Sequence, residues 1–305
     1  MYALSHLFIR SQTADGETAG GRICLTIHRI PRNNGLSLDG LSICEKGSHV
    51  APTLYLNSCY QRFQNGTPLE QLLDELLSLY RQSLANNPFD LNLLEQAESV
   101  RPRVAYRLIN AQSNRELLKT LPHIPVLDLA KVFYLDLGAD ERGAMTVRIT
   151  GAHLAHWGMD LETLSRLADE NTPRLFPARI LSIGEALGEL LPSGGRETGH
   201  PLYILSNQNG LSGAACMLYT DILKDFADRM KANLVVLPSS IHEVLLLPDR
   251  GDQNYEELSR TVASINRSEV DPEERLSNNV YLFSRSTGRL RIAPVVTGPL
   301  QAFSD

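Results

Sequence analysis

The chain has 305 residues, of which 43% are hydrophobic and 21% charged, proportions typical of a folded globular protein rather than a disordered one. The formal net charge is −6, and it is unevenly placed: residues 1–150 carry 15 basic and 15 acidic residues, and residues 151–305 carry 14 and 20. Neither part has the basic surplus with which a general nucleic-acid binder contacts phosphates, so nucleic acid is not an expected partner.

The sequence shows no sign of a membrane segment or of export. No apolar run approaches the roughly 18 residues of a membrane helix, and the first residues lack the basic region and cleavage site of a signal peptide. The four cysteines have no C-x-x-C spacing, so reduced thiols are expected. We therefore expect a soluble cytoplasmic protein that does not contact membranes and binds no cofactor or metal.

Residues 1–21 are small and polar in their second half and predict a flexible lead-in. The alternation of apolar and polar residues over 23–28 then predicts a half-buried strand. Asn33-Asn34-Gly35 favours a turn with positive φ. A second strand is expected over 36–43, interrupted near Gly40, and a short third strand over 53–56.

Residues 69–80 form the strongest predicted helix. Its apolar side chains recur with helical spacing and form one stripe. These residues are Leu69, Leu72, Leu73, Leu76, Leu77 and Tyr80. Thr67 fits the N-cap, and Glu70 completes a capping box with it.

The middle of the chain alternates between strand and helix patterns. A strand is expected over 104–109, and a capping box at Ser113 and Glu116 predicts a short helix that the link Pro122–Pro125 ends. Residues 131–137 and 145–150 predict a hairpin. Asp160 is expected to cap the helix that follows it.

The C-terminal part repeats this mixture. Helices are expected at 182–191, 218–230 and 254–265, a loop at 192–199, and strands at 203–205 and 280–284. Two buried strands, 234–237 and 243–247, are joined by a tight polar link. Because the elements do not follow a regular βαβα order, we predict an α+β fold with mixed, mostly antiparallel sheets. The expected domains are an N-terminal half at 22–150 and a C-terminal half at 151–290, followed by a tail at 291–305.

Several blocks of the sequence resemble those of an uncharacterised bacterial family. The blocks, in chain order, are NNGLSLDGLSI, PHIPVLDLAKVF, NTPRLFPA and LPSSIHEVLLLPD. The family has about 300 residues, carries only a domain-of-unknown-function label and is often met in mobile genetic elements of gut anaerobes. The resemblance covers roughly residues 22–285 and implies no activity, because the family has none established.

The link between the two buried strands holds the most reactive set of side chains. Ser240, His242 and Glu243 supply a hydroxyl, an imidazole and a carboxylate, the groups of a serine hydrolase. Such a site needs the hydroxyl within reach of the ring, which sequence does not show, and no G-x-S-x-G elbow is present. The competing interpretation, which we favour, is that these groups hydrogen-bond the backbone of a turn.

Two further patterns are weaker candidates. Asn207 and Asn209 lie after a strand and before a helix, where amides and a helix N-terminus can bind a small polar ligand or an anion. An amide-rich turn is the alternative reading, and we favour it. His153 and His156 are three residues apart, but no third metal ligand is specified, and we favour a short surface helix with Trp157 packed into the core.

Three functional hypotheses follow. The first is a non-enzymatic accessory protein, tied to mobile elements, that binds an unknown protein partner through its acidic C-terminal half. The second is a hydrolase that uses Ser240, His242 and Glu243. The third is a sensor that binds a small ligand near Asn207.

Overall fold

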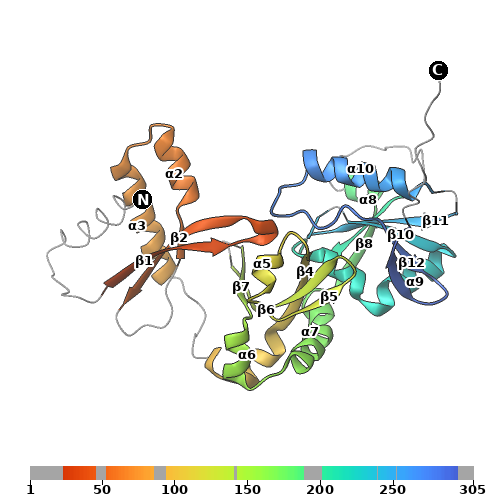
Figure 1. Ribbon diagram of the computed structural model, residues 1–305, viewed down its shortest axis with the longest axis horizontal. Helices are drawn as coiled ribbons and strands as arrows, with labels where there is room; N and C mark the ends of the chain where they lie inside the picture. Colours follow the sequence, from red (N-terminus) through yellow and green to blue (C-terminus); the bar gives the residue numbers. More distant parts are fainter. Residues whose placement is uncertain are drawn as a thin grey trace. The chain divides into compact units, whose positions relative to one another are not determined.

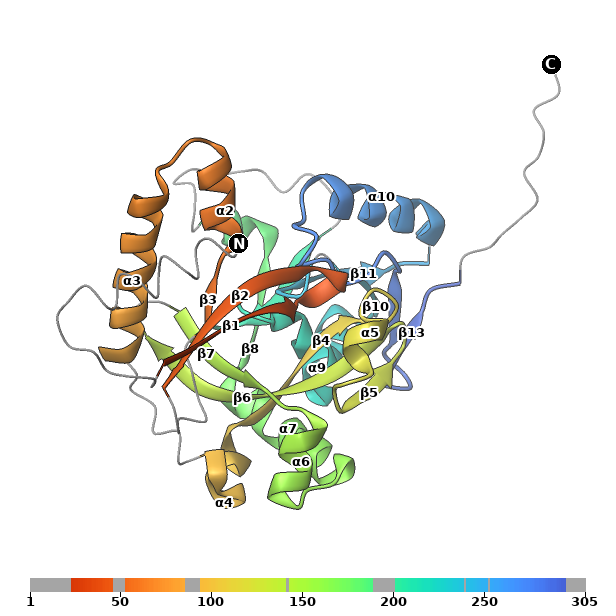
Figure 2. The same ribbon diagram turned by 60° about the vertical axis from the view of Figure 1, so that its left-hand side comes forward.

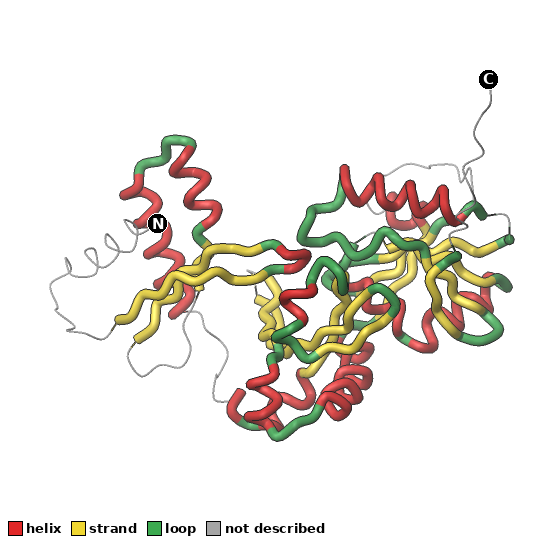
Figure 3. The backbone as a smooth tube through the Cα atoms, viewed as in Figure 1, coloured by secondary structure: helices red, strands yellow, loops and turns green. Residues whose placement is uncertain are grey.

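The computed structural model describes residues 23–45, 53–85, 94–140, 143–188, 201–238, 240–251 and 253–294. Contacts between Cα atoms divide the chain into two compact units, Met1–Glu95 and Gln96–Asp305. Figure 1 shows the elements of both units in chain colours, and Figure 3 shows the same view coloured by secondary structure. The predicted lead-in lies outside the described residues, as does nearly all of the predicted tail.

The first unit contains a three-stranded antiparallel sheet and two helices. The strands are β1 (Ile23–Pro31), β2 (Ser37–Glu45) and β3 (Thr53–Tyr55), and the helices are α2 (Asn57–Gln64) and α3 (Leu69–Ala85). The apolar stripe of α3 packs on the face of the sheet that carries Leu41 and Ile43, as the spacing predicted. Asn34 and Gly35 have the expected positive φ values of 57° and 72°.

The predicted break at Gly40 is wrong, because β2 runs through it. Gly40 pairs with His28 of β1 and with Tyr55 of β3. A Cβ atom at this position would lie 2.4 Å from Cδ1 of Ile30 and 2.8 Å from Cγ2 of Thr53. The glycine therefore leaves room for the side chains of Ile30 and Thr53 to pack directly on the backbone of β2, and the strand continues through it.

The second unit begins with α4 (Ala97–Val100) and then forms a four-stranded antiparallel sheet. Its strands are β4 (Val104–Asn110), β5 (His123–Val126), β6 (Leu129–Asp140) and β7 (Gly143–Arg148). The long strand β6 pairs with the other three. The predicted hairpin over 131–150 is confirmed by the pairing of β6 with β7.

Helices cover both faces of this sheet. The face with Val132 packs against α5 (Arg115–Leu118) and Leu121. The opposite face carries Lys131 and packs against α7 (Leu161–Leu175), which follows α6 (Gly151–Trp157) and lies beside the sheet in Figure 2. The side chain of Asp160 caps α7 by accepting from the Thr163 N–H at 2.8 Å, as expected.

Two local predictions in this region are wrong. The link expected at Pro122–Pro125 instead lies mostly in the edge strand β5, where a proline is tolerated because one side of the strand is unpaired. The capping box at Ser113 does not form. Helix α5 begins after Asn114, and the N–H of Ser113 donates to Asn110 Oδ1 at 2.8 Å.

A six-stranded antiparallel sheet completes the second unit. Its order is β13 (Arg289–Ile292), β12 (Tyr281–Ser284), β10 (Asn233–Pro238), β11 (Val244–Asp249), β9 (Tyr203–Asn207) and β8 (Ala178–Ser182). The strands predicted at 234–237 and 243–247 are confirmed as β10 and β11, which pair with Val235 opposite Leu247. Strands β8 and β13 were not predicted.

This sheet also lies between helices. The side chains of Val235 and Leu237 contact α10 (Tyr255–Ser268), which lies along one face of the sheet in Figure 1. On the other face, the ring of Tyr203 in β9 meets Phe226 of α9 (Thr220–Met230) edge-on at 4.9 Å. Helix α8 (Ile183–Gly188) follows β8. The helix predicted from 218 begins at Thr220, because Gly213–Leu218 form a separate 3₁₀ helix, η4.

Together these elements confirm an α+β fold with antiparallel sheets. The domain boundary expected near residue 150 stays a prediction. Helix α7, which follows this residue, contacts β4 and β6, which precede it. Within the described ranges, no helix is long and apolar enough to cross a membrane.

Candidate functional site

The link between β10 and β11 is held on two sides by the backbone. The N–H of Ile241 donates to the carbonyl of Glu274 at 2.8 Å, and its carbonyl accepts from the N–H of Ala214 at 3.2 Å. The N–H of Ser240 donates to the carbonyl of Glu243 at 3.3 Å, which closes the link on itself. Its residues are therefore fixed between η4 and the turn that precedes β12.

Both ring nitrogens of His242 face neighbours. Nδ1 accepts from the N–H of Ser212 at 3.2 Å, and Nε2 lies 3.3 Å from Oε1 of Glu274. A nitrogen that accepts carries no proton, so the neutral ring is protonated on Nε2 and directs that proton toward Glu274. The ring is thus oriented by a backbone amide and a carboxylate.

The Ser240 side chain contacts the backbone, and the ring of His242 contacts a different carboxylate. The Ser240 hydroxyl is buried and accepts from the backbone N–H of His242 at 3.0 Å, an arrangement typical of a tight turn. The acid that reaches the ring is Glu274 rather than the predicted Glu243. Ser239 lies outside the described residues.

Asn207 and Asn209 lie beside this link. The amide of buried Asn207 donates to the carbonyl of Leu211 at 2.7 Å and accepts from the N–H of Asn209 at 3.1 Å. Its side chain therefore stabilises its own turn. The hydroxyl of Ser206 donates to the carbonyl of His242 at 2.7 Å, so the structure brings the two predicted sites together as one region.

Gly213 shows how tightly this region is packed. A Cβ atom there would lie 2.1 Å from Oγ of Ser206, 2.4 Å from the carbonyl oxygen of His242 and 2.7 Å from the amide nitrogen of Asn207. The hydroxyl, imidazole and amide groups of the region are directed at one another and at the backbone. Catalysis at Ser240 and ligand binding at Asn207 stay predictions. In this structure, the side chains of both residues hydrogen-bond the backbone of their own turns.

The two histidines of α6 have different surroundings. The ring of His153 accepts at Nδ1 from the N–H of Thr150 at 3.1 Å and stacks on Trp157 with ring centres 5.3 Å apart. Burial, and then the nearby His156, hold the pKa of His153 below its usual value. Across the described ranges, no group of three or more possible metal ligands is present.

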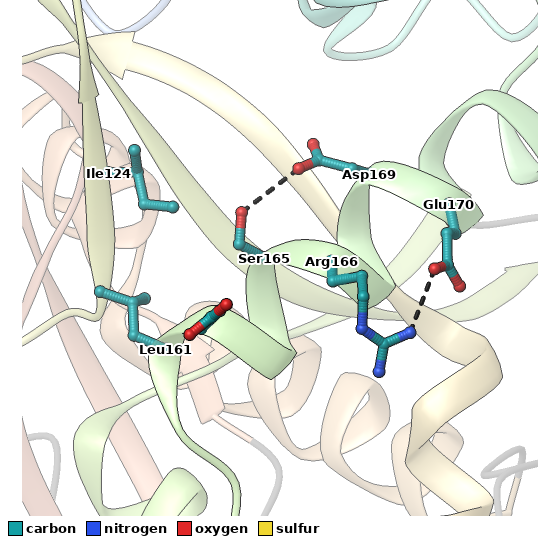
Figure 4. A pocket seen from close by; sticks show the side chains of 7 residues that line it. Ile124, Leu161, Ser165, Arg166, Asp169 and Glu170 are labelled. Atoms are coloured by element: carbon teal, nitrogen blue, oxygen red, sulfur yellow. Dashed lines mark hydrogen bonds and ion pairs between the residues drawn. The ribbon is translucent and has the colours of Figure 1, made fainter.

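An open groove of about 800 Å³ lies between α7 and the edge strand β5. Figure 4 shows Ile124 and Leu161 at one end, Ser165 in the middle and Asp169 at the other end. The remaining lining residues are Glu162, Arg166 and Glu170. Arg166 donates to Glu170 at 3.1 Å. Leu161 has 39% of its surface exposed.

Lys131 of β6 lies beneath the acidic end of this groove. Its ammonium group donates to Asp169 Oδ1 at 2.9 Å and to Ser165 Oγ at 2.9 Å, and it faces the rings of Tyr106 and Phe133 at 5.2 and 5.9 Å. The Lys131 side chain is 9% exposed and that of Asp169 is 53% exposed. The cation is therefore covered, and the carboxylate faces the groove.

A second hollow of about 620 Å³ lies at the end of α9. Its central carboxylate, Asp228, is bound by Lys224 and by Nε of Arg285, the latter at 2.7 Å. The N–H of Arg285 donates to Asn233 Oδ1 at 2.9 Å. These pairings hold the turn after β12 against α9 and explain the charges of the hollow.

The sequence did not reveal the groove or the partner of His242. Ile124 and Leu161 are far apart in the chain and in different kinds of element, and Glu274 follows a helix that begins well after His242. No local spacing relates these residues. Leu161 itself continues the helical spacing of the buried Leu164 and Ala168, so its sequence pattern indicates a core position rather than a groove.

Comparisons with known proteins agree with the sequence blocks described above. The model of a family of unknown function, DUF5688, matches residues 12–285. No curated protein matches the chain, and no solved structure matches it.

Proposed function

We propose that this chain, which belongs to the family of unknown function DUF5688, binds a segment of a partner protein in the groove between α7 and β5. The observation that carries the proposal is the pair Ile124 and Leu161, an aliphatic surface beside an open groove of about 800 Å³. Apolar side chains that line a groove are typical of binding sites, since covering them removes apolar surface from water.

The charged side chains around this pair favour binding over catalysis. Arg166 is paired with Glu170, and Lys131 with Asp169, so the groove presents ion pairs rather than an activated nucleophile. The α7 wall of the groove belongs to the acidic part of the chain, where a contact surface was expected. The resemblance to a family met in mobile genetic elements supports an accessory role there.

Site-specific photocrosslinking tests this proposal. Leu161 is replaced by p-benzoylphenylalanine in the full chain, which is expressed in the bacterium that carries the gene. Ile265 of α10 is the matched control, because it is also an aliphatic residue on a helix of the same unit and is 47% exposed. We expect one reproducible adduct from position 161 that is absent from position 265.

The adduct is then mapped by mass spectrometry, and the purified partner is titrated with the unmodified chain. Leu161→Ala should weaken binding about fivefold, from the loss of about 1 kcal/mol of apolar burial. Equal adducts at both positions, adducts with this chain alone, or unchanged affinity after Leu161→Ala would overturn the proposal.

A further inference from the structure

The groove beside α7 is chemically asymmetric along its length. Leu161, Ser165 and Asp169 follow one another at four-residue intervals, so they form one row on the helix. Glu162, Arg166 and Glu170 form the adjacent row with the same spacing. The rows begin beside Ile124 and end at two carboxylates, as Figure 4 shows.

The charges exposed at the groove are negative on balance. Asp169 is bound from below by Lys131, but half of its side chain is exposed, whereas the lysine is covered. Arg166 is already paired with Glu170. Counting the three lining carboxylates against Arg166 and Lys131 leaves a net charge of −1 at the groove. A cation that approaches from solvent is therefore favoured over an anion.

The geometry sets the spacing of the ligand groups. Leu161 and Asp169 are eight residues apart on one helix, which corresponds to about 12 Å along its axis at 1.5 Å per residue. A ligand that covers the aliphatic end and reaches Asp169 must carry an apolar group and a cation at about this separation.

Strand pairing is a poor way for such a ligand to bind. β5 is the edge strand beside the groove, and its third residue is Pro125, which has no N–H to donate. Recognition through an added strand would lack one main-chain hydrogen bond at this position. Side-chain contacts with α7 are the remaining route.

We infer that the groove binds a cationic amphipathic segment of the partner protein, in which an aliphatic or aromatic side chain covers Leu161 and Ile124 and a lysine or arginine about 12 Å away pairs with Asp169. This inference rests on the proposed function and adds the chemistry of the partner. An anionic partner such as nucleic acid is disfavoured at the same surface.

The test uses fluorescent helical peptides and the full chain. The probe peptide carries one leucine and one lysine eight residues apart in an alanine- and glutamine-rich background, and one control has glutamate in place of lysine. A second control has serine in place of leucine. Anisotropy titrations at 50 and 200 mM NaCl should show binding of the probe that is at least tenfold tighter than that of either control, and weaker binding at the higher salt.

Variants of the chain locate the site. Asp169→Asn should weaken binding of the probe about threefold, and Leu161→Ala about fivefold. Glu256→Gln is the matched control and should change nothing, since Glu256 is exposed on α10, the helix that packs against the six-stranded sheet. Circular dichroism confirms that the variants are folded.

Equal binding of the lysine and glutamate peptides, no binding of any peptide, or no effect of Asp169→Asn would overturn the inference. Tighter binding of a single-stranded oligonucleotide than of the probe would do the same. These outcomes are separable from failure of the proposed function. If the adduct at position 161 maps to an uncharged segment of a partner, the proposed binding groove stands and only the inference of a cationic partner is overturned.

Discussion

The link between β10 and β11 and the groove beside α7 contain the same kinds of side chain, namely hydroxyls, carboxylates and a cation or an imidazole. In the link, Ser240 and His242 are bound to backbone groups of neighbouring turns. In the groove, Asp169 is held from below and remains half exposed. The presence of reactive residue types is therefore weaker evidence for a site than the exposure of their hydrogen-bonding groups to solvent.

The largest expected effect lies at the link. In Gly213→Ala the new Cβ would meet two backbone atoms within 2.7 Å, so the link and η4 must separate. We expect a loss of about 3 kcal/mol or more in the free energy of unfolding, or failure to fold. Gly184→Ala is the control, because its nearest contact would be 3.9 Å away. Urea unfolding that shows equal stability for both variants would contradict the tight packing described for the link.

The dependence of stability on alkaline pH tests the burial of two ionisable groups, Cys216 and Tyr134. Burial raises the pKa of the Cys216 thiol in η4 to about 12, and burial likewise raises the pKa of Tyr134 in β6 to about 12. Both groups bind protons more tightly in the folded chain, so their contribution to stability is complete below pH 8 and falls as pH rises through the unfolded values of 9.0 and 10.0.

By pH 10.5 this loss should be on the order of 3 kcal/mol, at about 1.4 kcal/mol per pH unit for each group. Urea unfolding between pH 8 and 10.5 measures it. Cys216→Ala should flatten the profile from pH 9, and Tyr134→Phe from pH 10. Profiles parallel to that of the unmodified chain would show that neither group is buried as described.

The smallest expected effect lies in the groove. Asp169→Asn removes the charge that pairs with covered Lys131, and we expect a loss of about 1.5 kcal/mol in the free energy of unfolding, less than for a fully buried pair because Asp169 is half exposed. Adding Lys131→Met should recover most of this loss, since the unpaired cation is then gone. A double variant that is less stable than Asp169→Asn alone would show that the pair is not the source of the effect.

The parts of the fold that depend on local spacing were predicted from the sequence. The stripe of α3, the pairing of β10 with β11 and the cap of α7 each depend on residues within a few positions of one another. The errors have tertiary causes. Gly40 is required by Ile30 on the neighbouring strand, and Pro125 is accepted because β5 is an edge.

The candidate sites were predictable only in part. The sequence indicated Ser240 and His242 as neighbours, but the acid at the ring, Glu274, comes from the turn before β12. The groove required knowledge of which strand lies beside α7, because Ile124 gives no signal in the sequence. Long-range pairing of this kind is decided by the sheet order, which residue patterns do not specify.

Asp128, at the turn between β5 and β6, has a consequence for the order in which the chain folds during synthesis. Its carboxylate accepts from Ser277, Asn279 and Tyr281, which follow it by 149, 151 and 153 residues. A ribosome that adds roughly 5–20 residues per second needs many seconds to deliver those donors after Asp128 emerges. Until then the carboxylate of Asp128 is bound by water, and the unit completes its folding only when its last strands have left the ribosome.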